Sequence, residues 1–465
     1  MDEIVLVVQT KGRKRKCAGL ERRINSRSSI TGEINLAHEI PAPRPQKRRG
    51  AIIRENAGLA LSEPASEGPD TAQQPERTFA PTKYEDGKNK GDTGEPKPKK
   101  RRRKKKVQSP VVYNIPDVVR KETTFRGRLG YACLNTVLRA RKPDPVFCSR
   151  TCRIETIEKN GMQFVFDLAL QNVRDLGKLI EWNEANNIKF MRVSSEMFPF
   201  ASHPKYGYDL SFADEELKVL GRMANSLGHR LTTHPGQFTQ LGSPKEGVVT
   251  QSVNELEYHC EMIDRMELGV DSVMIIHMGG VYGDKQATLE RFKHSYGTRL
   301  SDRIKSRLVL ENDEICYNLD DLIPVCDELN IPIVVDYHHD WINPSTRPVT
   351  ELIPIVNQIW QRKGIKVKQH HSEPRPGAES VMEKRAHADR CKSLPEGLPD
   401  DVDLMIEAKD KEQAVFELYR VYNISPVIHE NLRPPNPAPM LATAGRKSSA
   451  KQRYVTSTLD SALVE

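Results

Sequence analysis

Acidic and histidine side chains stand at the ends of apolar runs in the middle of this chain. Residues 331–341 read IPIVVDYHHDW, which begins with the composition of a strand buried on both faces and then continues with Asp336 and His339. Burying such groups in an apolar core costs on the order of several kcal/mol unless something compensates them. A metal ion, a paired charge and solvent are the candidate partners.

The same feature recurs in six successive apolar runs, so it is a property of position along each run. The side chains concerned are His234, His277, Glu311, Asp336 with His339, His370, and Glu407. Imidazole and carboxylate ligands without thiolates suit Mn²⁺ or Zn²⁺ before other ions. Because these ligands exceed one octahedral shell, we expect two or three ions that share bridging carboxylates. Clustered ions suit phosphodiester hydrolysis, although a sugar isomerase with one or two metals remains a rival.

Eight apolar runs alternate with segments of helical period and could bring these residues together. The runs are GRLGYAC, KFMRVSS, HRLTTH, SVMIIHMGG, RLVLEND, IPIVVDYHH, IKVKQHH and VDLMIEAKD. The helix candidates between them include residues 173–186, 215–226, 252–266, 319–329, 349–362 and 411–422. This alternation predicts an α/β fold with a closed (β/α)8 TIM barrel, whose active site lies at the carboxyl ends of the strands. An open doubly wound sheet is the alternative, disfavoured because no glycine-rich phosphate loop follows the first strand.

The basic charge of the chain is concentrated before the barrel. Of 71 Lys+Arg and 63 Asp+Glu residues, residues 1–124 hold 28 and 16, which leaves 43 and 47 for the rest. The composition of residues 1–124 predicts a disordered basic N-terminal arm, followed by the barrel at 125–424 and a disordered C-terminal tail at 425–465. Within the arm, the run KPKKRRRKKK from Lys97 to Lys106 is typical of a nuclear import signal or a phosphate contact.

The motifs in the barrel region resemble those of the UV damage endonucleases. They are LGYACLN, SSEMFPFASH, HPGQF, HMGG, LENDE, VVDYHH, VKQHH and MIEAKDKEQA, which occur in this order. The resemblance implies a TIM barrel with a trinuclear cluster, usually of Mn²⁺, with Zn²⁺, Mg²⁺ or Co²⁺ as alternatives. It also implies an endonuclease that nicks DNA immediately 5′ to cyclobutane pyrimidine dimers and (6-4) photoproducts, with cleavage at abasic sites in some members.

Carried over by position, the resemblance assigns metal ligation to nine residues. They are His203, His234, His277, Glu311, Asp336, His339, His370, His387 and Glu407. His338 adjoins His339 and His371 adjoins His370; because neighbours on a strand point to opposite faces, we expect only one of each pair to reach the cluster.

Lys368 lies two residues before His370 and therefore on the same strand face. A cationic lysine among metal ligands would be repelled, so Lys368 must be neutral, turned outward or chemically altered. The resemblance implies a catalytic role beside Glu311 and Asp336, because the matching lysine resembles a carboxylated residue that faces the metals and tunes activity.

Damage recognition requires side chains that enter the base stack. Gln237 and Phe238 directly follow His234 and offer an amide and an apolar ring at the top of the barrel. The resemblance gives these two, with Tyr131, the role of probing the duplex, and it places Asn135 near the lesion.

The expected partners are damaged double-stranded DNA and, through residues 97–106, nuclear import receptors; we expect a monomer. No apolar run is long enough to span a membrane, and the start of the chain lacks the pattern of a secretory signal, so we expect a soluble intracellular protein. The basic run at residues 97–106 predicts a nuclear location. The sequence leaves open whether its first residues add an organelle address, such as a mitochondrial one. Rival functions are an abasic-site endonuclease on the same barrel and a DNA-binding scaffold with a structural metal.

Overall fold

Eight parallel strands form a closed barrel in the computed structural model, which describes residues 112–437. The strands are β1 (Arg128–Ala132), β2 (Phe190–Arg192), β3 (Arg230–Thr232), β4 (Met274–His277), β5 (Leu308–Glu311), β6 (Ile333–Val334), β7 (Lys368–His371) and β8 (Asp403–Ile406). One sheet has the order β3-β2-β1-β8-β7 and the other β4-β5-β6. The bridges Thr233–Met274 and Asp336–His370 join the two sheets at both edges. The predicted TIM barrel is therefore confirmed, and each of the eight apolar runs contributes one strand.

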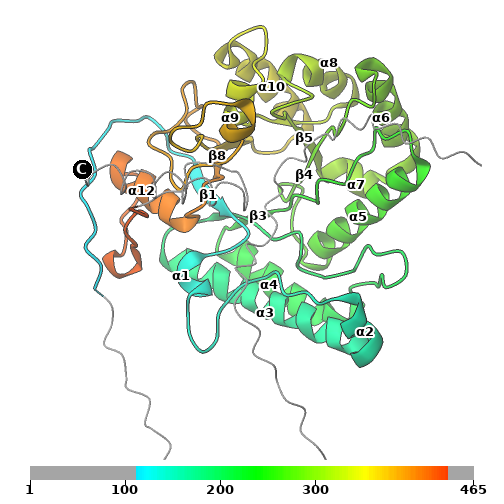
Figure 1. Cartoon of the computed structure of the whole chain (residues 1–465), viewed down its shortest axis with the longest axis horizontal. Helices are drawn as coiled ribbons and strands as arrows, with labels where there is room; N and C mark the ends of the chain where they lie inside the picture. The colour runs from blue at the N-terminus through cyan, green and yellow to red at the C-terminus, as the bar shows by residue number, and fades with distance from the viewer. Residues whose placement is uncertain (1–111, 438–465) are drawn as a thin grey trace, which may run out of the picture. The chain divides into compact units, whose positions relative to one another are not determined.

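Helices surround these strands in Figure 1 and cover the outside of the barrel. They are α1 (Thr136–Arg139), α2 (Ile154–Asn160), α3 (Met162–Ala185), α4 (Asp214–Ser226), α5 (Glu246–Arg265), α6 (Lys285–Arg299), α7 (Asp302–Arg307), α8 (Leu319–Leu329), α9 (Tyr337–Ile342), α10 (Val349–Lys363), α11 (Val381–Lys384) and α12 (Glu412–Tyr422). Two short 3-10 helices, η1 (Ser211–Ala213) and η2 (His429–Asn431), complete the set. Because the strands are covered on both faces, most of their apolar side chains join one core cluster that extends into most of the helices, while Ala132, Phe190 and Met405 form a small second cluster.

The sixth apolar run differs from its prediction, because only its first half is a strand. Strand β6 ends at Val334, and Asp336 then caps helix α9: its Oδ1 accepts hydrogen bonds from the backbone N–H groups of His338 and His339, both at 2.8 Å. A carboxylate that accepts these two bonds satisfies donors that a helix start leaves unpaired. His339 therefore lies on a helix and not on the strand that the sequence suggested.

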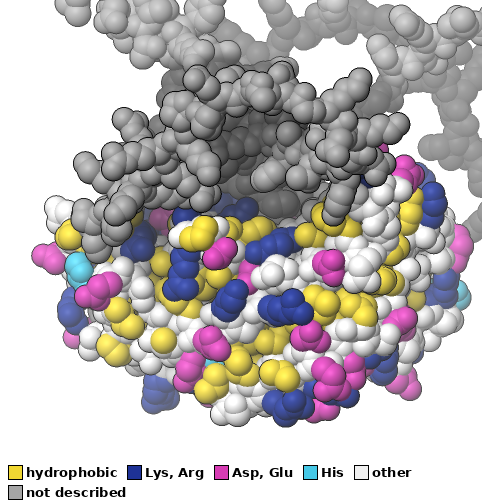
Figure 2. Space-filling model, turned by 90° about the horizontal axis from the view of Figure 1, so that it is seen from below, with side chains coloured by type: hydrophobic (Ala, Val, Ile, Leu, Met, Phe, Trp, Pro, Cys, Tyr) yellow, Lys and Arg dark blue, Asp and Glu magenta, His cyan; other side chains and the backbone are white. Residues whose placement is uncertain are grey.

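The predicted arm and tail lie mostly outside the described residues, so their disorder stays a prediction. Residues 112–124 contain no helix or strand, but the N–H of Lys121 donates to the carbonyl of Val421 at 2.9 Å, and Leu432 is buried. In residues 112–437 no helix has the length and apolar character needed to cross a bilayer. Figure 2 shows basic, acidic and apolar side chains interspersed on one face of this part of the chain.

A buried ion-pair network closes the amino-terminal end of the barrel. The carboxylate of Asp403, at the start of β8, accepts hydrogen bonds from Arg128 Nε at 2.6 Å and Arg230 Nη1 at 2.8 Å. Burial by itself would raise the pKa of Asp403, but the bonds from Arg128 and the charge of Arg230 outweigh burial and hold this pKa below its ordinary value. The network therefore contributes stability above the ordinary pKa of an aspartate, and this contribution is lost as the pH falls through the lowered one.

We expect Asp403→Asn to lower the free energy of unfolding by about 3–5 kcal/mol at pH 7, because two arginines would lose their buried anion. Asp401→Asn is the matched control, since Asp401 is exposed and pairs with Lys366 at 2.8 Å; its cost should stay below about 1 kcal/mol. Denaturant unfolding measures both. The difference between wild type and Asp403→Asn should shrink in acid, and equal stabilities at pH 7 would contradict the network's role.

Candidate metal centre

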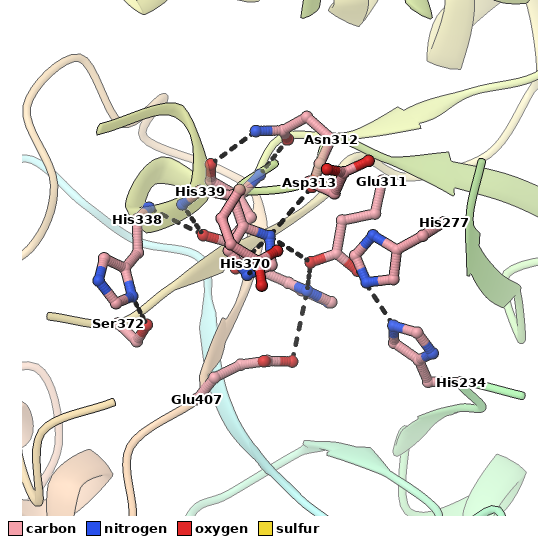
Figure 3. Close-up of polar contacts among 12 residues, drawn as sticks. His234, His277, Glu311, Asn312, Asp313, His338, His339, His370, Ser372 and Glu407 are labelled. Atoms are coloured by element: carbon pink, nitrogen blue, oxygen red, sulfur yellow. Dashed lines mark hydrogen bonds and ion pairs between the residues drawn. The ribbon is translucent and has the colours of Figure 1, made fainter. Parts of the chain in front are cut away.

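Glu311, the last residue of β5, is the centre of the cluster at the opposite end of the barrel. Its Oε1 lies 2.8 Å from His370 Nδ1 and 3.6 Å from His339 Nδ1, while its Oε2 lies 3.2 Å from His234 Nε2 and 3.7 Å from His277 Nε2. Figure 3 shows these histidines gathered around the carboxylate. They come from the carboxyl ends of β4 and β7, the turn after β3, and helix α9. Only barrel closure brings these four segments to one carboxylate.

Two groups of potential metal ligands share Glu311. The first consists of His234, His277 and Glu311, and the second of Glu311, Asp336 and His370; within each group the ligand atoms lie within 4.8 Å of one another. Glu407, which follows β8, adjoins the second group, with its Oε1 3.4 Å from His370 Nδ1. A carboxylate common to two such groups has the position of a bridging ligand.

The buried carboxylates and histidines of the cluster shift one another's pKa values. Burial alone would raise the pKa of Glu311, but interactions with His370 and His277 lower it well below its ordinary value. Burial, together with the charge of Glu311, raises the pKa of Asp336 to about 7, although His339 opposes the rise. Although burial opposes it, Asp336 and Glu314 raise the pKa of His339 to about 10. The carboxylates therefore hold a proton on His339, and this charged ring supplies part of the positive charge that the buried acidic groups require.

Two atoms of the cluster are buried without a hydrogen-bond partner. They are Oδ2 of Asp336 and Nδ1 of His277, and a buried acceptor left in this state is costly. Asp336 uses its other oxygen to cap α9, so Oδ2 remains available to a ligand. Nitrogen and carboxylate-oxygen donors are those that Mn²⁺ and Zn²⁺ accept. The residues present therefore fit divalent metal ions.

Lys368 points into the cluster, so it is not turned outward, and the neutral and the chemically altered forms remain as alternatives. The side chain is fully buried, and its Nζ contacts His370 Nε2. Burial and the nearby charge of Arg192 lower the pKa of Lys368 to about 7, although Glu311 opposes the change. A substantial share of Lys368 is therefore uncharged near neutral pH, which is compatible with its place among cation ligands.

Arg192 belongs to the cluster but was not singled out from the sequence. It ends β2 and forms a buried ion pair with Glu407, and this charge helps to lower the pKa of Glu407 well below its ordinary value against the effect of burial. Arg192 could have been found by the same sequence feature that identified the other residues of the cluster. An ionisable side chain stands at the end of an apolar run, in KFMRVSS.

The two histidine pairs behave differently. On β7 the neighbours point apart as expected: His370 faces Glu311, whereas His371 Nε2 donates to the carbonyl of Ser393 at 3.0 Å. His371 instead belongs to a separate group with Glu373 and Cys391, whose ligand atoms also lie within 4.8 Å of one another.

The other pair lies on α9, where strand alternation does not apply. His339 approaches Glu311, and the ring of His338 lies 5.4 Å from that of His387 between centroids. His338 also hydrogen-bonds through Nδ1 to Ser372 Oγ at 2.6 Å. Both members of this pair therefore lie beside the cluster, because successive helical residues do not point to opposite faces.

The two ligands predicted on loops have different surroundings. The loop between β7 and β8 folds back through a bridge between Pro374 and His387, which brings His387 to 6.5 Å from His339 between ring centroids. The hydrogen bonds and ring contacts of His203 lie within its own loop, where Nδ1 accepts from the N–H of Tyr206 at 3.2 Å. A ligand role for His203 therefore stays a prediction.

The predicted DNA-contacting residues differ in exposure: Phe238 is exposed, Gln237 is half-buried, and Tyr131 and Asn135 are buried. Phe238, in the loop between β3 and α5, is 69% exposed, and Gln237 precedes it. Tyr131 and Asn135 are fully buried; the hydroxyl of Tyr131 donates to Asn183 Oδ1 at 2.7 Å and accepts from Asn135 Nδ2 at 3.1 Å. This arrangement packs β1 against α3, so it gives no support to the duplex contact predicted for Tyr131 and Asn135.

Comparison with known proteins finds relatives among the UV-damage endonucleases. Residues 127–432 match the family model described as UV-endonuclease UvdE. The chain is 53% identical over 318 residues to a UV-damage endonuclease of Schizosaccharomyces pombe, which covers 66% of this chain and 53% of the relative. It is 50% identical over 342 residues to the Neurospora crassa UV-damage endonuclease, with coverages of 64% and 52%. The chain thus spans about half the length of these curated relatives.

A solved structure also resembles this chain. The crystal structure of SacUVDE is 27% identical, with a TM-score of 0.56, and the match covers 63% of this chain and 97% of that one. The shared fold includes nearly the whole of the solved protein.

We expect His370→Asn to weaken Mn²⁺ binding by about 10- to 100-fold or more, because the change removes a nitrogen donor from the centre of the cluster. His229→Asn is the control: His229 is equally buried but pairs with Glu184 at 2.8 Å, away from the cluster. Elemental analysis after dialysis against Mn²⁺ measures the metal per chain. The same metal content in both variants would remove His370 from the ligand set.

Proposed function

This chain belongs to the UV-endonuclease UvdE family, and from that membership we propose that it is a DNA repair endonuclease. Its substrate would be duplex DNA that carries UV photoproducts, namely cyclobutane pyrimidine dimers and (6-4) photoproducts. It would nick the damaged strand immediately 5′ to the lesion and thereby initiate excision repair. The S. pombe and N. crassa relatives, both named UV-damage endonucleases, support this proposal.

The observation that carries the proposal is the position of Glu311 between two groups of potential ligands. We assign the holding of two or three divalent ions, with Mn²⁺ the expected one, to nine residues. They are His203, His234, His277, Glu311, Asp336, His339, His370, His387 and Glu407. Bound ions would lower the pKa of a water molecule and neutralise charge that develops on the phosphate.

The side chains of the barrel would prepare the site for this chemistry. Glu311 bridges the two groups of potential ligands. The side-chain amide of Asn312 fixes the backbone of Asp336: its Oδ1 accepts from the N–H of Asp336 at 2.8 Å, and its Nδ2 donates to the carbonyl of Asp336 at 3.0 Å. Arg192 holds the Glu407 carboxylate in place. Lys368, uncharged for much of the time near neutral pH, could exchange a proton with a group at the reacting phosphate, and its carboxylation stays a prediction.

We expect Glu311→Gln to reduce nicking by a factor of about 100–1,000 or more, since a bridging charge is lost, while affinity for the damaged duplex stays within a few-fold. The assay is incision of an end-labelled duplex with one thymine dimer, with and without Mn²⁺. Glu328→Gln is the control, because Glu328 is exposed on α8 and pairs with Lys293. Duplexes with an abasic site or no lesion test specificity.

A wild-type protein that leaves the dimer duplex intact with every divalent ion would overturn the proposed function. Strong nicking at the abasic site with little at the dimer would assign the protein to abasic-site cleavage instead. Normal nicking by Glu311→Gln would remove Glu311 from the site.

We also propose that residues 97–106, which lie outside the described residues, direct the protein to the nucleus through import receptors. Deletion of residues 1–106 should leave incision at low salt within about 2-fold of wild type, since the barrel carries the chemistry. The same deletion should impair nuclear entry of a fluorescent fusion. Deletion of residues 1–96 keeps the basic run and should preserve entry. Loss of incision by the longer deletion would place the arm in the catalytic machinery.

A further inference from the structure

Trp341 is an exposed aromatic residue beside the metal centre. It is 53% exposed, whereas the other two tryptophans of the chain, Trp182 and Trp360, are buried. Helix α9 carries Trp341 together with His339, and it begins directly after its capping residue Asp336. The indole lies 6.1 Å from the ring of His338 between centroids, so it stands at the edge of the cluster.

The surroundings of Trp341 combine apolar surface with one cation. Lys384 lies with its Nζ 5.1 Å from the centroid of the indole, and Val381 and Met382 on the same short helix α11 are 55% and 44% exposed. Arg385 anchors the end of α11 to the loop after β5, since its Nε donates to Glu314 Oε1 at 2.7 Å. Lys384 thus brings α11, with its two exposed apolar side chains, to the exposed indole, and exposed apolar surface beside a candidate site is typical of a binding surface.

The position of Trp341 relative to Phe238 favours a nucleobase as the ligand. Phe238 follows β3 and Trp341 follows β6, so the carboxyl ends of β4 and β5, with His277 and Glu311, lie between them in the barrel. A nuclease that unstacks a lesion must fill the space in the duplex and also accommodate the displaced base. Two exposed aromatic residues on different sides of the ligand cluster suit these two tasks.

We propose that Trp341 and Lys384 form a binding site for one unstacked nucleotide of the damaged strand. The base stacks on the exposed part of the indole, and the ammonium of Lys384 contacts the phosphate of the same nucleotide. This inference rests on the proposed function and adds to it a binding site on the β6 side of the barrel. A protein partner is the alternative occupant, but the shared helix with His339 gives a substrate contact the more direct explanation.

Tryptophan fluorescence tests the stack without relying on turnover. In a Glu311→Gln background, which keeps the substrate uncut, a duplex with one thymine dimer should quench the emission of Trp341. The quenching should disappear in Trp341→Phe, because the two remaining tryptophans are buried. Quenching that persists in Trp341→Phe, or that is absent in the presence of Trp341 at saturating DNA, would overturn the proposal.

Affinity provides the second measurement, in the same background. We expect Trp341→Ala to bind the dimer duplex about 10-fold more weakly, which is within the range of one base–aromatic stack, and Trp341→Phe to remain within about 3-fold. Val219→Ala is the control, since it removes an equally exposed apolar side chain from α4. Lys384→Gln should weaken binding and reduce its dependence on salt.

The outcomes separate this inference from the proposed function. If the wild-type protein nicks the dimer duplex while Trp341→Ala binds and nicks as wild type does, only the nucleotide site is wrong. If the wild type neither binds nor nicks that duplex, both proposals fall. Circular dichroism of Trp341→Ala excludes misfolding, and recovery of affinity in Trp341→Phe distinguishes stacking from a structural role.

Discussion

The buried negative charge of Glu311 must be balanced inside a closed barrel, and the arrangement of the site follows from this requirement. An isolated carboxylate in such a place would be very costly, so its position depends on partners from other strands. Histidines from four separate segments supply these partners, and none is close to Glu311 in sequence. Closure by the bridges β3–β4 and β6–β7 is therefore as necessary to the centre as the ligands themselves. Divalent cations would complete the charge balance that the histidines leave unfinished.

The barrel and most of its ligand cluster could be predicted from the sequence because both depend on short-range signals. Buried parallel strands require continuous apolar runs, and all eight runs contain a strand. Because the carboxyl ends of such strands meet, an ionisable residue at the end of a run is placed without knowledge of any contact. His234, His277, Glu311, His370 and Glu407 all reach the cluster in this way. Arg192 carries the same signal and would have been found by applying the rule to cations as well as to ligands.

The remaining details depend on packing that no local pattern specifies. The apolar run before Asp336 suggested a strand that continues to His339, but the carboxylate of Asp336 caps a helix. The alternation of strand side chains between two faces therefore does not apply to His338 and His339. His387 lies on a loop whose path is set by contacts such as the bridge to Pro374. Tyr131 was expected at the duplex because of its motif, yet its hydroxyl bonds to Asn183 and Asn135 between β1 and α3. A tyrosine at a strand end can point to either face, and its sequence position alone does not decide between them.

The two ends of the barrel use the same kinds of residue for opposite purposes. At the amino-terminal end, Asp403 meets two arginines at hydrogen-bond distance, so its charge is fully paired by fixed groups. At the carboxyl-terminal end, Oδ2 of Asp336 accepts no hydrogen bond, and the carboxylates there share the protonated ring of His339. A fully paired network stabilises the fold but offers nothing to a ligand, whereas an incompletely paired one costs stability until a cation binds. The Arg192–Glu407 pair lies at the second end and neutralises one carboxylate permanently, which limits how much positive charge the site requires. In the proposed nuclease, divalent cations at the carboxyl-terminal end would neutralise the remaining carboxylates before a phosphate group of the DNA approaches them.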